Sequence, residues 1–318
     1  MRTRIFYLII LLIFTSCSKN YKTSENFLLI FTDVDNFWKM YDEVKFETNE
    51  EKRVSIIKKE YFNRATKGFE KLIKKDKLTP EKYSNYLKDT LFYNSIRETV
   101  LSFKKDSLRI KNSVKSFSKT YPKSKYSDIY FVIGFFYHGG INIDNSIIIE
   151  PQHFTKTDSL KNYSLLNSYI GKSLMTPESI VPLILHEQVH LNQKNKKGNS
   201  LLRNAIVEGS ANFLMFLKTK KVQSSIVNTY RYGLENEEEI WKQFKSDRKK
   251  ELSFVENNWY NNYNREDIYP DLGYFIGHKI CENYYRKSKD KMKAIEFLLT
   301  EKDFETILRM SKYDEKFD

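Results

Sequence analysis

The sequence predicts an α+β fold that is mostly helical, with a small sheet and an N-terminal helical lobe. Apolar residues recur with helical periodicity from residue 26 to about 118 and again across most of the C-terminal half. Between these stretches lie two short apolar runs, at 129–136 and 147–149, which are typical of buried strands. We therefore expect a helical lobe over residues 27–120 and a second region, over 121–318, that contains the sheet.

The N-terminus has the pattern of a secretory signal. Two arginines precede the ten apolar residues 5–14, a run that is too short to span a membrane but typical of a signal peptide. The sequence Phe-Thr-Ser-Cys at 14–17 resembles a bacterial lipobox. Residues 1–17 are therefore predicted to be a lipoprotein signal that ends at Cys17, the lipidated residue, and 18–26 a polar tether. An ordinary signal peptide, cleaved nearby, is the alternative.

Aromatic residues recur at helical spacing in the N-terminal lobe. Phe37, Trp38, Tyr41 and Val44 fall at positions i, i+1, i+4 and i+7, and similar patterns follow over 61–92. Such a stripe is more typical of a helical core than of a ligand-binding surface, because aromatic side chains bury large apolar areas. We expect these helices to pack on the region that follows.

The spacing of the apolar residues changes after the N-terminal helical lobe. The run 129–136 is predicted to be a buried strand, Gly139-Gly140 a turn or bulge, and 147–149 a second strand. We assign residues 141–150 to the edge of the sheet. Single histidines and acids that follow a strand are usually structural, so we nominate no metal ligand from the polar residues near this edge, which are His138, Glu150 and His153.

The most specific motif is His-Glu-Gln-Val-His at residues 186–190, within an apolar helical run. Histidines four residues apart lie on one face of a helix, so His186 and His190 can bind one metal ion. Glu187 lies between them, where it can act as a general base toward a metal-bound water. The alternative is an exposed helix with two surface histidines. The apolar neighbours argue against it, because buried polar groups need partners and a cation would supply one.

A third ligand is predicted on the next helix, over residues 201–214, which follows a Gly-Asn-Ser break that ends in a good N-cap. Glu208 falls on the apolar side of this helix. Seventeen residues separate it from His190, enough for a turn and a return helix. Two histidines and a glutamate leave the fourth zinc position open for water, as a catalytic site requires. Glu208 could instead be a buried carboxylate paired with Arg203 or a lysine.

Asn212 lies one turn beyond Glu208. We expect it either to hydrogen-bond His186 or Glu208 behind the metal or to be an exposed polar residue. Gly209 and Ala211 are small, so this helix is expected to approach the HExxH helix closely.

HExxH followed by Glu-Gly-Ser-Ala at 208–211 resembles the pattern of gluzincin metallopeptidases. More narrowly, the chain resembles a family of zinc-dependent proteases, formerly a domain of unknown function, that occur as lipoproteins in Bacteroidetes. It also resembles the gliding-motility lipoproteins of that phylum. Softer matches at 35–42, 139–140 and 271–280 extend the resemblance over most of the mature chain.

The resemblance implies a zincin-like metallopeptidase core in residues 121–318, Zn²⁺ as the cofactor and a peptide or protein as the substrate. It also implies that the sheet edge beside the HExxH helix pairs with an extended substrate backbone. Residues 18–26 lack the acidic cluster that accompanies surface export in many lipoproteins of Bacteroidetes. We therefore expect a lipid-anchored protein of the cell envelope, on the outer membrane and facing the periplasm.

The C-terminal part is predicted to be helical, with an exposed helix over 235–244 and a buried helix over 271–285. Gly273 and Gly277, four residues apart, allow the buried helix to pack closely on a neighbour. Cys281 on the same helix is expected to be a buried and inert thiol, because the lipidated cysteine cannot pair with it.

Zincins commonly place a tyrosine or a histidine opposite the metal, where it stabilises the oxyanion of the tetrahedral intermediate. Tyr274 is our candidate for this catalytic role, and His278 is the second. The alternative for both residues is simple helix packing.

Composition limits the possible functions. The chain has 54 basic and 41 acidic residues, a formal net charge of +13, and loss of Arg2 and Arg4 with the signal would leave +11. The lysines are spread along the whole chain and no nucleic-acid motif occurs, so we expect no nucleic-acid partner. Attraction to anionic headgroups is a more direct consequence of the charge. Hydrophobic residues make up 40% of the chain, enough for a substantial core.

The expected function is that of a membrane-anchored zinc metallopeptidase. His186, His190 and Glu208 would bind Zn²⁺, and Glu187 would be the general base, with Tyr274 opposite the metal. One rival is a non-catalytic envelope or gliding-associated lipoprotein that zinc stabilises. The other is a binding module without metal, in which the histidines are incidental.

Overall fold

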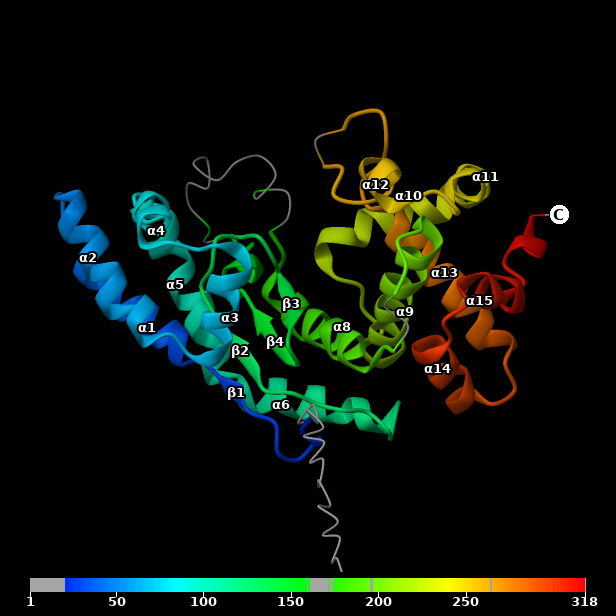
Figure 1. Cartoon of the computed structure of the whole chain (residues 1–318), viewed down its shortest axis with the longest axis horizontal. Helices are drawn as coiled ribbons and strands as arrows, with labels where there is room; N and C mark the ends of the chain where they lie inside the picture. The colour runs from blue at the N-terminus through cyan, green and yellow to red at the C-terminus, as the bar shows by residue number, and fades with distance from the viewer. Residues whose placement is uncertain are drawn as a thin grey trace, which may run out of the picture.

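The computed structural model describes residues 21–317 except 159, 161–170, 172–173, 195–196 and 264. A small sheet lies between an N-terminal and a C-terminal group of helices (Figure 1). The predicted α+β fold, mostly helical with a small sheet, is therefore confirmed. The predicted signal peptide and its lipidation residue, Cys17, lie outside the described residues.

The N-terminal group contains the helices α1 (Thr32–Val44), α2 (Glu50–Glu60), α3 (Lys67–Asp76), α4 (Pro80–Tyr86), α5 (Thr90–Lys105) and α6 (Ser107–Lys115). The C-terminal group contains α8 (Ile180–Asn192), α9 (Leu201–Thr219), α10 (Val227–Glu235), α11 (Glu237–Asp247), α12 (Leu252–Trp259), α13 (Leu272–Lys287), α14 (Lys291–Thr300) and α15 (Phe304–Ser311). The strands are β1 (Leu29–Ile30), β2 (Ile129–Phe131), β3 (Gly140–Ile143) and β4 (Ser146–Ile149).

The sheet has the strand order β1-β2-β4-β3, in which β1, β2 and β4 are parallel and β3 is antiparallel to β4. Asp144 and Asn145 both have positive φ and form the two-residue turn between β3 and β4, as the hairpin twist favours. The edge strand is therefore β3. The prediction that all of 141–150 forms the edge was wrong, because β4 lies inside the sheet.

The strand predicted at 129–136 is also shorter than expected. β2 ends at Phe131, and the rest of the apolar run 129–136 leaves the sheet. Phe136 has a φ of 62°, which no strand residue adopts. A short apolar run shows that a segment is buried, but not whether it is a strand.

Helix α8 packs against both halves of the hydrophobic core. Ile180, Leu183 and Ile184 contact the cluster that contains the sheet and the N-terminal helices. Leu185 and Val189 contact the cluster formed by the C-terminal helices. The helix that carries the HExxH motif is consequently buried nearly all round, as its sequence predicted.

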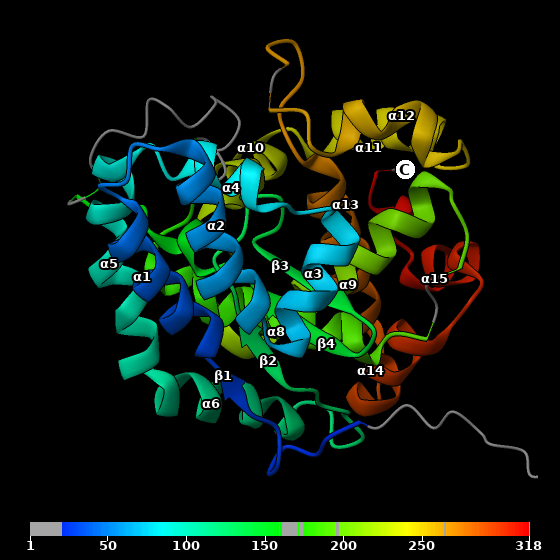
Figure 2. The same ribbon diagram turned by 60° about the vertical axis from the view of Figure 1, so that its left-hand side comes forward.

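Helices α9 and α13 lie side by side (Figures 1 and 2) and cross at two glycines. A Cβ atom at Gly277 would overlap the carbonyl oxygen of Ala205, and one at Gly209 would overlap the backbone of Gly277. Helix α9 also packs on the HExxH helix, as predicted. Gly209, however, lies at the crossing with α13. Gly273 packs against the ring of Tyr260.

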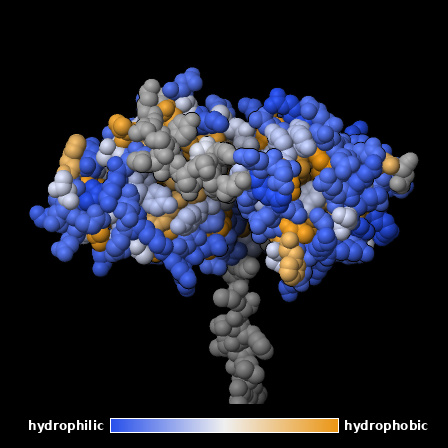
Figure 3. Space-filling view, turned by 90° about the horizontal axis from the view of Figure 1, so that it is seen from above, coloured by the Kyte–Doolittle hydropathy of each residue, from blue (hydrophilic) through white to orange (hydrophobic). Residues whose placement is uncertain are grey.

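The face seen in Figure 3 is mostly hydrophilic, with hydrophobic residues scattered over it. Such scattered apolar residues are normal on a protein surface. Within the described part of the chain, we find no helix with the length and apolarity that crossing a membrane requires.

Candidate metal centre

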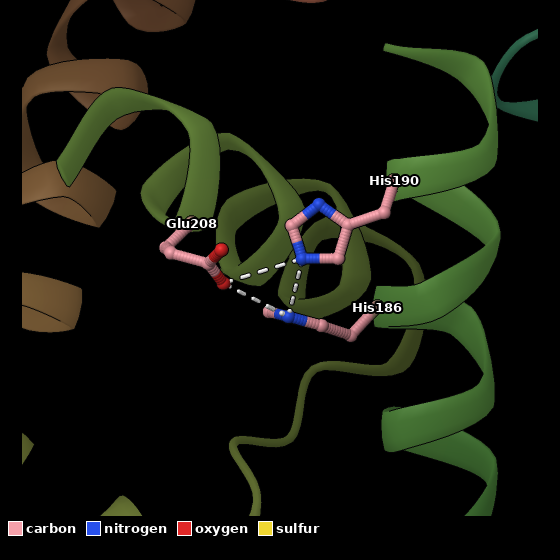
Figure 4. A group of neighbouring side chains, drawn as sticks. All are labelled: His186, His190 and Glu208. Atoms are coloured by element: carbon pink, nitrogen blue, oxygen red, sulfur yellow. Dashed lines mark hydrogen bonds and ion pairs between the residues drawn. The ribbon is translucent and has the colours of Figure 1, made fainter. Parts of the chain in front are cut away.

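Helices α8 and α9 bring two histidines and a glutamate together (Figure 4). The Nε2 atoms of His186 and His190 lie 2.9 Å apart. Glu208 Oε2 lies 3.3 Å from the first and 3.2 Å from the second. His186 and His190 lie one turn apart on α8. Helix α9 begins after Ser200, whose side-chain hydroxyl accepts a hydrogen bond from the backbone N–H of Arg203. The ligand atoms of the three predicted residues therefore lie close enough together to bind one metal ion.

Two amide side chains orient the imidazole rings. Asn212 Oδ1 lies 2.8 Å from His186 Nδ1, and Gln193 Oε1 lies 2.8 Å from His190 Nδ1. Gln193 donates its amide nitrogen to the carbonyl of Val207, so its oxygen must face the ring. Each Nδ1 therefore carries the proton and donates it to an amide oxygen. The lone pair of each Nε2 then faces Glu208.

This arrangement fits a bound cation. The two Nε2 atoms and the Glu208 carboxylate would be three hydrogen-bond acceptors within 2.9–3.3 Å of one another, with no proton between them. Three such acceptors repel each other unless a cation neutralises them. Ligand atoms around one tetrahedral zinc at about 2.0–2.2 Å are separated by about 3.4 Å, close to the distances found here. Imidazole and carboxylate ligands suit zinc well.

Without a metal, a proton takes the place of the cation. Burial alone would lower the pKa of His190, but the adjacent Glu208 carboxylate outweighs it and raises that pKa to about 9. Burial would likewise raise the pKa of Glu208, but His190 and His186 hold it well below its usual range. The metal-free pair is therefore a protonated His190 next to an ionised Glu208.

We expect zinc affinity to fall about tenfold per pH unit from about pH 8 to pH 7. The sign follows from the raised pKa of His190: below pH 9 the metal-free ring holds a proton, which zinc must displace. Competition titrations against a fluorescent chelator measure the affinity. Calorimetry in buffers with different ionisation enthalpies should show release of about one proton per zinc. An affinity independent of pH over this interval would contradict the raised pKa.

Glu187 lies beside the edge strand. Asn142, on β3, donates its side-chain amide to Glu187 Oε2 at 2.6 Å and to the Glu187 carbonyl oxygen at 2.9 Å. A Cβ atom at Gly140 would lie 3.0 Å from Glu187 Cγ, so this position leaves little room for a side chain. β3 therefore packs directly on the HExxH helix and holds one carboxylate oxygen of Glu187.

The three candidate ligands and Glu187 line a cavity of about 480 Å³. Tyr274, at the start of α13, lines the same cavity, and burial raises the pKa of its hydroxyl well above the usual range. His278 does not line it. This residue lies one turn further along α13, where its Nδ1 is 2.9 Å from the hydroxyl oxygen of Tyr230. The structure thus places Tyr274 at the cavity and the second candidate, His278, behind its wall.

Sequence reasoning missed two residues that shape this site. Gln193 caps the end of α8, where it contacts His190, and it connects this helix to α9 through Val207 and Ser210. Asn142 reaches Glu187 from the sheet. A glutamine three residues after the second histidine was a weak signal for the first contact. The second contact joins residues 45 apart, and no local pattern could have indicated it.

A comparison with known families identifies the chain. The family model described as gliding motility protein GldB matches residues 23–315. The chain belongs to this family. The resemblance to gliding-motility lipoproteins is therefore confirmed over most of the chain, whereas this match gives no support to a protease family. No curated protein and no solved structure matches this GldB-family chain significantly.

Proposed function

We propose that this GldB-family protein is an envelope lipoprotein that acts in gliding motility and contains a zinc centre formed by His186, His190 and Glu208. The family match over 23–315 supports the biological role. The three convergent acceptor atoms support the zinc centre. Lipidation at Cys17 would anchor the protein to the outer membrane, facing the periplasm, and zinc would join α8 to α9.

A second candidate function is peptide hydrolysis at the same centre. The observation that favours it is the open side of the triad: three ligands face a cavity that also contains Glu187, whereas structural zinc sites are usually closed by four protein ligands. Zinc would supply a water of lowered pKa and polarise a peptide carbonyl. Glu187 would take a proton from the attacking water and pass it to the leaving amine.

The surrounding residues support this second function. The Tyr274 hydroxyl has no hydrogen-bond partner among the described residues, and Tyr274 lines the cavity, where this hydroxyl would donate to the developing oxyanion. Three residues of β3 line the cavity: Gly140, Ile141 and Asn142. An extended peptide would pair with this edge strand.

Substitution of Glu187 separates the two functions. We expect Glu187→Gln to keep about one zinc per chain, because this side chain is not a ligand. Under the first proposal the variant restores gliding to a strain that lacks the protein, while a His190→Ala variant does not. Glu178→Gln, an exposed acid just before α8, is the matched control.

Zinc content and gliding on agar are the measurements. Loss of gliding in the zinc-loaded Glu187→Gln protein, with the control unaffected, would favour peptide hydrolysis at the centre over a purely structural role of zinc. Gliding that survives in both Glu187→Gln and His190→Ala would contradict any role of the centre in motility.

A further inference from the structure

A second polar pair lies at the cavity of the zinc centre: His138 lines the cavity, and Asp76 contacts His138. His138 belongs to the loop between β2 and β3, and its Nε2 lies 3.2 Å from Asp76 Oδ1. Asp76 is the last residue of α3, and its other oxygen is buried without a partner among the described residues. The pair therefore joins the N-terminal helices to the wall of the cavity, and neither residue has a role in the zinc centre itself.

The loop that carries His138 is held in an unusual conformation. Phe136 is a bulky residue in the left-handed region, with a φ of 62°. Its N–H donates to Glu150 Oε2 at 2.9 Å, and Glu150 is buried at the end of β4. Gly134 leaves room for this carboxylate, since a Cβ there would lie 2.7 Å from it. Strained backbone of this kind persists where surrounding contacts enforce it, often at functional sites.

The loop brings the residues that follow His138 against the HExxH helix. Gly139 and Gly140 pack on Leu183, where a Cβ atom at either would lie 3.1 Å from Leu183 Cδ2. Leu183 lies one turn before Glu187 on α8. His138 thus directly precedes the residues that pack on α8 about one helical turn before Glu187.

The partner of His138 determines which ring nitrogen carries the proton. An ionised carboxylate accepts hydrogen bonds and cannot donate, so the contact with Asp76 places the proton on Nε2. When the imidazole is neutral, Nδ1 then has a lone pair. None of the described residues donates a hydrogen bond to it. His138, a residue of the cavity lining, thus presents an acceptor to which no described residue donates.

We propose that His138, oriented by Asp76, is a ligand-binding residue that accepts a hydrogen bond from an N–H group of a peptide whose carbonyl end binds the zinc. A free amino terminus and a backbone amide both supply such an N–H group. The inference rests on the proposed zinc centre but does not require turnover, because a bound peptide would make the same contact in a non-catalytic protein.

Short peptide hydroxamates test the proposal, because the hydroxamate binds zinc and the peptide extends along the cavity. We would measure the Kd by calorimetry at pH 8, with zinc-loaded protein and with peptides whose amino terminus is free or acetylated. The variants are His138→Ala, Asp76→Asn and the double variant. Asp144→Asn, an exposed acid at the other end of β3, is the matched control. Zinc content and melting temperature are recorded for each variant.

His138→Ala is expected to weaken binding about tenfold, the effect of losing one hydrogen bond. Asp76→Asn is expected to weaken it similarly, although the imidazole remains, because an amide donor would move the ring proton to Nδ1. The double variant should be no weaker than either single variant, since both remove the same contact. A preference for the free amino terminus would identify that group as the donor, and equal affinities would identify a backbone amide.

Two outcomes would overturn the proposal, and they differ. Unchanged affinity in both His138→Ala and Asp76→Asn, with zinc-dependent binding intact, would remove the His138 contact alone. No zinc-dependent binding of any hydroxamate to the wild-type protein would overturn the contact together with the proposed zinc centre.

Discussion

The double variant His186→Ala, His190→Ala is expected to bind no zinc, whereas the wild-type protein binds about one zinc per chain. The two imidazoles supply two of three ligand atoms, and Glu208 alone leaves a single carboxylate. Glu208→Ala should also lose the metal, because two histidines without the carboxylate bind zinc weakly at neutral pH. Elemental mass spectrometry of protein that starts at Ser18 measures the content.

Loss of zinc is also expected to lower stability. A ligand that binds only the folded state stabilises it by about 4 kcal/mol at a free concentration one thousand times its Kd. The wild-type melting temperature should therefore fall when a chelator is added, while that of the double variant should not change. His138→Gln is the matched control, since this residue lines the cavity but lies outside the triad, and it should keep full zinc content. A wild-type protein that takes up no zinc at neutral pH would remove the metal centre altogether.

Gly277→Ala is expected to destabilise the protein by about 3 kcal/mol or more. An added methyl group would overlap the carbonyl oxygen of Ala205, a backbone atom that cannot turn away. In an uncrowded helix the same change would stabilise by about 1 kcal/mol, so even the sign of the effect tests the close crossing. Glu208 precedes Gly209, the residue of α9 at this crossing. We therefore expect zinc affinity to fall along with stability.

Urea unfolding and the zinc titration described above measure these two effects. Arg286→Ala, at an exposed position of the same helix, is the control and should change stability by no more than about 0.5 kcal/mol. Gly209→Ala should resemble Gly277→Ala, because its methyl group would overlap the same crossing. A stable Gly277→Ala protein with normal zinc affinity would show that the helices can separate without moving Glu208.

Helix periodicity predicted most of the architecture. The helix expected at 201–214 is α9, which begins after the predicted N-cap, Ser200, and runs on to Thr219. The helix expected at 271–285 is α13. These predictions succeeded because each helix turn repeats its pattern within a few residues. The strands were predicted less well, because pairing between β2, β4 and β3 depends on residues far apart in the sequence.

The residues of the candidate site were also predicted only in part from the sequence. The HExxH spacing placed His186 and His190 on one helix face, and Glu208 was found from the apolar face of the next helix. The supporting contacts of Gln193 and Asn142 were not found, because each depends on how separate elements pack. The choice between Tyr274 and His278 also needed the packing of α13, since both lie on the same helix one turn apart.

The sequence by itself determined which residues can bind a metal, because ligand spacing on a helix is local and its geometry is invariant. It also determined the mostly helical fold and the resemblance to gliding-motility lipoproteins. The tertiary structure decided that Glu208 meets both histidines, that β3 is the strand beside Glu187 and that Asp76 orients His138. These contacts join residues 18 to 62 positions apart. They exist only because the buried core and the glycine crossing bring their elements together, and no local pattern records that packing.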